Sequence, residues 1–253
     1  MTTVLESELE TLLPSPESAL KSNQTFSDRL HARVLTLLAR VERSEAYQTV
    51  FSAEADPVYV AAVVKYVLLE VFSYGPHVTE ATFTAIGRFP KHEAKLMEKL
   101  ALHDAEEADH GEMALADALK LGLNESWART RRISPDSFAM GAAVRLIATQ
   151  LSPFAYLGYM YPFEALTPIL TERLKKVLAV KKFPENATGF VDYHAVADVR
   201  HAAVLRKIIE EITTKYPAAE AEIDYAFDIF SCVYPLPIWE QCMRQAQAEV
   251  IKK

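Results

Sequence analysis

One stretch of the chain, from Val191 to Arg206, constrains the fold most strongly. It reads VDYHAVADVRHAAVLR, and its alanines, its apolar spacing and its lack of Gly and Pro predict the middle of a helix. Within it, His194, Asp198 and His201 stand at i, i+4 and i+7, which places them on one helical face, within about 60° of one another. Two imidazoles and a carboxylate need polar partners once they are buried. A transition metal such as iron satisfies all three at once.

A second triplet has the same spacing. His103, Glu107 and His110 stand at i, i+4 and i+7 in a helix expected over residues 90–121. Glu106 is the alternative to Glu107, because it lies only about 60° from His103 on the helical wheel. One such triplet could be a salt-bridged surface. Two copies on separate helices predict a shared site for two metal ions.

Composition and pattern together predict an all-α protein. The chain has 253 residues, of which 50% are hydrophobic, and only 7 are Gly, which suits a helical domain with a sizeable core. No alternation of apolar and polar residues lasts long enough to predict a sheet. We expect a lead-in over residues 1–25 and a single helical domain over residues 26–253, a bundle of about seven to eight helices.

Charge and cysteine content exclude several classes of function. A net charge of −7 argues against nucleic acid as a partner, and two Cys are too few for a disulfide framework or a cysteine zinc site. The first residues lack the pattern of a signal peptide, and no uninterrupted apolar run reaches the roughly 18 residues that span a membrane. We therefore expect a cytoplasmic protein that binds no membrane.

Two isolated carboxylates stand within apolar sequence. Glu70, in VVKYVLLEVF, is either a metal ligand from a third helix or the partner of a buried Arg or Lys. Glu164, in FAYLGYMYPFEALTPIL, is favoured as a ligand. The aromatic residues around it form either ordinary core or the wall of an apolar substrate cavity; they are Phe154, Tyr156, Tyr159, Tyr161 and Phe163.

Two further features predict local structure. Gly75 and Pro76 are expected to interrupt the helix that begins at Pro57, because Pro cannot donate a helical hydrogen bond. His31 has no ligand-like neighbour at helical spacing, so we expect it at the surface or at the boundary of the core.

These motifs resemble those of the haem-oxygenase-like di-iron oxidases and oxygenases, relatives of the TenA/PqqC fold. The late-helix motif of that family looks like His194, Asp198 and His201, and the resemblance covers the chain from about Asp56 to Tyr216. One departure stands out. Several members carry a Glu seven residues before the middle-helix His, and this chain has His103 there.

The resemblance implies a haem-oxygenase-like bundle whose core holds two Fe(II) ions, with an iron–manganese pair as the alternative and O2 as cosubstrate. The implied metal ligands are Glu70, His103, Glu107, His110, Glu164, His194, Asp198 and His201. His103 is either a ligand or a residue that holds a ligating carboxylate.

The reaction that the resemblance implies is an O2-dependent oxidation of a small organic acid or amine: hydroxylation, N-oxygenation or oxidative C–C cleavage. The expected partners are this substrate, a reductase or other electron donor, and a second copy of the chain in a homodimer. Two alternatives stay open. One is a non-catalytic metal-binding or interaction protein of the same fold. The other is a TenA-like hydrolase, which needs a nucleophilic Cys in its pocket.

Overall fold

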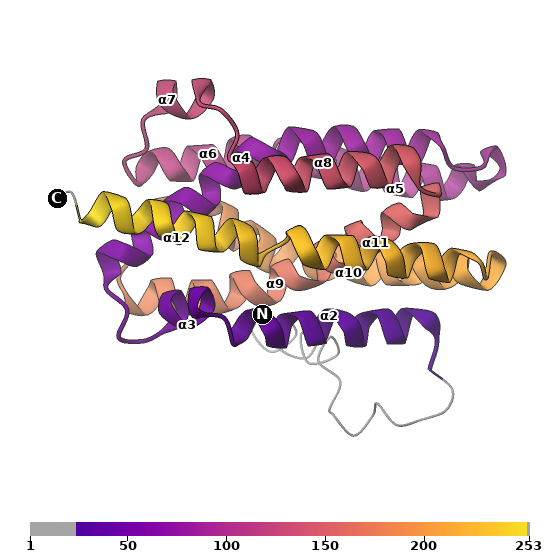
Figure 1. Ribbon diagram of the computed structural model, residues 1–253, viewed down its shortest axis with the longest axis horizontal. Helices are drawn as coiled ribbons and strands as arrows, with labels where there is room; N and C mark the ends of the chain where they lie inside the picture. The colour runs from indigo at the N-terminus through magenta and orange to yellow at the C-terminus, as the bar shows by residue number, and fades with distance from the viewer. Residues whose placement is uncertain (1–23, 252–253) are drawn as a thin grey trace.

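The computed structural model describes residues 24–251, and the all-α expectation is confirmed over that range, where no strand is present (Figure 1). The elements are α2 (Phe26–Glu42), α3 (Glu45–Phe51), α4 (Pro57–Gly87), α5 (Ala94–Glu107), α6 (His110–Lys120), α7 (Glu125–Thr130), α8 (Pro135–Gln150), α9 (Leu157–Val180), α10 (Gly189–Lys215), α11 (Ala219–Val233) and α12 (Leu236–Val250).

The chain enters the bundle through a capped helix. The Thr25 hydroxyl accepts the Asp28 backbone N–H, and the Asp28 carboxylate accepts the Thr25 N–H, which completes a capping box for α2. The expected lead-in over residues 1–25 lies almost wholly outside the described residues. The expectation for His31 is wrong: it is buried, and its Nδ1 lies 2.7 Å from the Tyr161 hydroxyl of α9, which supplies the polar partner that a buried imidazole needs.

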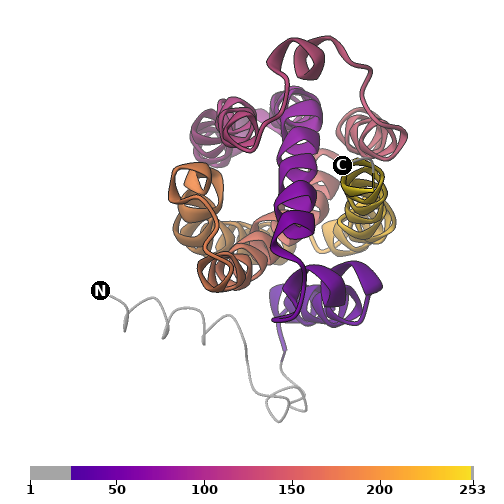
Figure 2. The same cartoon turned by 90° about the vertical axis from the view of Figure 1, so that its left-hand side faces the viewer.

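Helix α4 runs through the middle of the bundle, against α6, α8 and α12. Viewed along the long axis, its first half passes between α9–α10 on one side and α12 on the other (Figure 2). The expected break at Gly75 and Pro76 is wrong, because the helix continues to Gly87. It bends on the way, as a helix does where a proline removes one hydrogen bond while packing on both sides holds the rest (Figure 1).

Helix α4 is also the one helix in the described range that is long and apolar enough to cross a membrane. Half of its most apolar window is buried inside the bundle, and the core helix of a water-soluble protein has the same length and composition. Lys65 and Glu70 interrupt the apolar run, and both side chains are paired within the fold.

Two close contacts set the positions of the later helices. The Asp117 carboxylate of α6 accepts the Phe190 backbone N–H at 2.7 Å and so holds the first turn of α10. Gly158 of α9 allows α11 to approach, because a Cβ at this position would lie 2.0 Å from the Ile223 carbonyl oxygen. Gly122, with a φ of 84°, ends α6 as expected.

Glu70 fastens α4 to α8 and is fully buried. Its carboxylate accepts hydrogen bonds from the Arg131 guanidinium at 2.6 Å and from the hydroxyls of Ser134 and Ser137, each at 2.7 Å. The ligand role expected for Glu70 is therefore corrected to the alternative, a buried ion pair. Both carboxylate oxygens are used within this network, and none of its members belongs to the metal-ligating groups of the described chain.

The Glu70 network predicts a stability effect without a metal effect. Glu70→Gln leaves the buried Arg131 without a counter-charge, and the free energy of unfolding should fall by about 3 kcal/mol. Glu80→Gln is the matched control on the same helix, because it breaks an exposed pair with Arg145 and should cost less than about 1 kcal/mol. Chemical denaturation measures both. Equal losses, or a loss of bound iron in Glu70→Gln, would contradict the assignment.

Candidate metal centre

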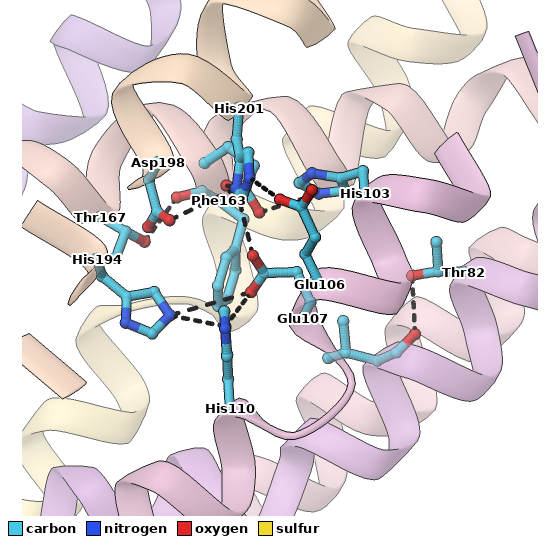
Figure 3. Close-up of polar contacts among 12 residues, drawn as sticks. Thr82, His103, Glu106, Glu107, His110, Phe163, Thr167, His194, Asp198 and His201 are labelled. Carbon is cyan, nitrogen blue, oxygen red and sulfur yellow. Dashed lines mark hydrogen bonds and ion pairs between the residues drawn. The ribbon is translucent and has the colours of Figure 1, made fainter. Parts of the chain in front are cut away.

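Seven of the eight expected ligands come together between four helices (Figure 3). Helix α5 contributes His103 and Glu107, α6 contributes His110, and α9 contributes Glu164. Helix α10 contributes the late triplet His194, Asp198 and His201, all of them buried. Six of the seven form two groups that share the Glu107 carboxylate, and His103 forms a third set of possible ligands with Glu107 and His201.

The first group is made by Glu107, His110 and His194. The Glu107 Oε2 atom lies 2.6 Å from His110 Nδ1 and 4.0 Å from His194 Nε2, and the two imidazole nitrogens are 3.0 Å apart. His194 Nδ1 lies 2.7 Å from the Phe190 carbonyl oxygen, which can only accept a hydrogen bond. The proton of a neutral His194 is therefore on Nδ1, and the lone pair of Nε2 faces the group.

The second group is made by Glu107, Glu164, Asp198 and His201. His201 Nδ1 lies 3.3 Å from Glu107 Oε1, 3.3 Å from Glu164 Oε2 and 3.7 Å from Asp198 Oδ1. All four of these atoms are buried and have no good hydrogen-bond partner within the described chain. Such atoms are rare in a folded protein, and a cation held between them would satisfy all four.

Glu107 belongs to both groups through different oxygens. Its Oε2 faces His110, and its Oε1 faces His201. A carboxylate with one oxygen toward each of two donor groups can bridge two metal ions. Glu106, the sequence alternative, is about half exposed and lies outside the groups, with its Oε2 3.1 Å from His201 Nε2 and 2.7 Å from the Arg200 guanidinium. Glu106 orients the His201 ring through Nε2, the nitrogen that faces away from the second group.

His103 lies beside the second group. Its Nε2 is 3.4 Å from Glu164 Oε1, and its ring packs edge-on against the His201 ring, with centroids 4.5 Å apart. The oxygen of Glu164 that faces the group is the other one, Oε2. The imidazole thus contacts the outer oxygen of a carboxylate whose inner oxygen points at the centre.

The first triplet is not on one continuous helix, so that part of the prediction is wrong. Helix α5 ends at Glu107 and α6 begins at His110, with Ala108 and Asp109 between them. The break turns His110 toward His194, while His103 stays on the side of His201. The same three residues therefore serve both groups, which a straight helix would not allow.

Electrostatics in the second group indicate a missing positive charge. Burial raises the pKa of Asp198 well above its usual value, and the negative charges of Glu164 and Glu107 raise it further. Burial alone would lower the pKa of His201, but the close contacts of its Nδ1 with the Glu107 and Glu164 carboxylates raise it to about 10. The clustered acids hold a proton on His201 where a metal ion would otherwise compensate them.

A cavity of about 170 Å³ opens beside the cluster. Tyr159 and Phe163 line it, so for them the substrate-wall interpretation fits. Tyr156 and Tyr161 are core residues bonded to Thr82 and His31. The remaining wall is mainly apolar and comes from α3, α4, α9 and α12.

Sequence reasoning missed Asp104 as a cavity residue. It is 3% exposed and lines the cavity. Burial raises the pKa of Asp104 to about 7. The available signal was its spacing, because Leu96, Leu100 and Asp104 follow one another at i, i+4 and i+8 on the buried face.

The donor set fits a metal ion such as iron. Imidazoles and carboxylates are the ligands that non-haem Fe(II) takes, and the four unpartnered atoms of the cluster all lie in the second group. The fit is to iron rather than to a Cys-type zinc site, since neither Cys232 nor Cys242 lies in these groups.

Metal loading should release protons. Below pH 10, metal-free His201 carries a proton that competes with the metal, so metal affinity should rise with pH up to that value. Anaerobic titration calorimetry with Fe(II), in two buffers of different ionisation enthalpy, counts the protons released. We expect a buffer-dependent heat at pH 7. Heats that are equal in both buffers would show that the metal does not displace a proton from this site.

Comparison with known proteins agrees with this geometry. A family model described as iron-containing redox enzyme matches residues 67–228, which is more than half of the chain. No curated protein sequence matches the chain.

Several solved structures share the fold. A domain of unknown function with a haem oxygenase-like fold, from Shewanella denitrificans, is 18% identical with a TM-score of 0.72, covering 87% of this chain and 92% of that one. A TenA homologue from P. horikoshii is 15% identical with a TM-score of 0.67, covering 88% and 100%. A TenA family transcription regulator from Silicibacter is 12% identical with a TM-score of 0.56, covering 83% and 96%.

At these identities the structural matches establish the fold alone. The family match covers the helices that carry all seven clustered residues. The chain belongs to the family of iron-containing redox enzymes, and its fold is haem-oxygenase-like.

Proposed function

We propose that this protein is an O2-dependent non-haem oxidase or oxygenase that holds two iron ions and acts on a small organic acid or amine with an apolar part. The observation that carries the proposal is the position of Glu107, with one carboxylate oxygen toward each of two groups of buried donors. An iron–manganese pair is the alternative metal content, because the same donors suit both ions.

The two ions would be held by different helices. His110 and His194 would hold the first ion together with Glu107. Glu164, Asp198 and His201 would hold the second, and Glu107 would contribute to both. Fe(II) bound in such a set, with coordination positions left open, supplies electrons for the reduction of O2.

Hydrogen bonds from the surrounding chain fix the donors. The Phe190 carbonyl fixes the His194 ring, and Glu106 accepts from Nε2 of His201. Such outer contacts orient a ligand and raise its basicity. The Arg200–Glu106 ion pair is largely exposed, and Glu106 also contacts the buried His201. We propose an external reductase as the electron donor, because this pair connects the protein surface with a ligand of the metal centre.

The cavity sets which molecules reach the centre. Tyr159 and Phe163 line the cavity together with Glu164, so burial of an apolar part of a substrate against them is favourable. A TenA-like hydrolase is disfavoured, since neither Cys232 nor Cys242 is among the described residues that line the cavity.

His103 is proposed to hold Glu164 rather than to bind a metal. Its Nε2 contacts the outer oxygen of Glu164 while the inner oxygen faces His201. His103→Gln retains a hydrogen-bond donor and should keep two ions bound, whereas His103→Ala should weaken the second ion. If His103→Gln bound a single ion, His103 would be a ligand.

Single substitutions test the proposed function through metal content and O2 uptake. His194→Ala should lose the first ion, Glu164→Ala the second, and Glu107→Ala both, because only Glu107 faces both groups. Elemental analysis after anaerobic Fe(II) loading counts the ions, and an oxygen electrode follows O2 uptake on mixing with air.

Unsubstituted protein should bind two ions and consume O2. Each variant should keep its helical circular dichroism, because the metal is added to a packed bundle. Two bound ions without O2 consumption would favour the non-catalytic metal-binding alternative.

A further inference from the structure

Asp104 is a buried acid in the cavity that the metal groups do not use. It is 3% exposed, it lines the cavity, and its Oδ2 has no hydrogen-bond partner in the range that the structure describes. Thr82 of α4 is the side chain that hydrogen-bonds to it. Asp104 precedes Glu107 by three residues on α5, so it lies one helical turn from the shared carboxylate.

No cavity-lining side chain that the structure describes forms an ion pair with Asp104, although the neighbouring His103 lowers its pKa. Among the described residues that line the cavity there is no Lys and no Arg. The neighbouring His103 directs its Nε2 at Glu164 instead. A buried carboxylate without a counter-charge is costly, and a cation brought by a ligand would relieve that cost.

The opposite end of the cavity is apolar. Val63 and Thr82 both line the cavity and are about five helical turns apart on α4. Val63 packs in a cluster with Val50 and Met243, far from Asp104.

The metal groups lie between the two ends of the cavity. Gly75 of α4, which lies between Val63 and Thr82 and nearer to Thr82, would place a Cβ 3.8 Å from the Cα of Gly111, the residue after His110. A ligand anchored at Asp104 thus extends along the cavity toward the metal groups.

We infer that the cavity binds an amphipathic primary amine, with its ammonium group on Asp104 and Thr82 and its apolar chain extending along the cavity toward the metal groups. The cavity of about 170 Å³ is close in size to cavities of about 150 Å³ that hold benzene, so a six-carbon amine is a fitting probe. The inference narrows the substrate class of the proposed function, but amine binding itself needs no bound metal.

Binding of n-hexylamine to the full chain tests the inference, with n-hexanol and n-hexanoate as matched probes. Trp239 lines the cavity and reports binding through its fluorescence, and a Trp127→Phe background removes the other tryptophan. We expect the amine to bind at least about tenfold more tightly than the alcohol or the acid. Asp104→Asn should weaken amine binding by about 30-fold or more, because it removes one partner of a buried charge pair.

Two control variants keep the test decisive. Asp104→Glu keeps the charge and should retain the preference for the amine, and Glu98→Gln removes an exposed charge from the same helix and should change nothing. Tighter binding of hexanoate, or unchanged amine binding in Asp104→Asn, would overturn the inference. Iron content, measured on the same variants, should remain at two ions. If the unsubstituted protein bound no iron, the proposed function would be contradicted. Amine binding is measured on metal-free protein, so it tests the inference separately.

Discussion

The placement of three carboxylates around one buried point is the constraint on which this structure depends. Glu107, Glu164 and Asp198 lie within the core of a helical bundle, where like charges repel and each costs solvation. One imidazolium, on His201, compensates them only in part. Positive charge is favoured at such a cluster, and a bound metal cation would provide it.

The surrounding helices are fastened by contacts that do not use the centre. Glu70 ties α4 to Arg131 and to α8, and Asp117 of α6 holds the start of α10. Because these anchors lie outside the metal groups, the bundle can be formed before metal binds. The ligand side chains are then already in position when the ion binds. Small domains that fold only with metal differ, because there the ion itself brings the ligands together.

The sequence predicted the late triplet because it lies on a regular helix, where spacing alone determines the face. It could not separate Glu70 from Glu164, since both are single acids in apolar runs. Glu70 forms an ion pair with Arg131, which is distant in the sequence, so spacing alone could not predict that pairing. The break at Ala108 was also hidden, since no Pro or Gly stands between Glu107 and His110. The burial of Asp104 could have been predicted from its spacing, because it follows Leu96 and Leu100 on the buried face of α5.

Anomalous diffraction at the iron absorption edge, from crystals of the iron-loaded protein, tests the central claim most directly. The account predicts two peaks, one on each side of the Glu107 carboxylate: one beside His110 and His194, the other beside Asp198 and His201. A single peak, or iron bound anywhere away from Glu107, would contradict it.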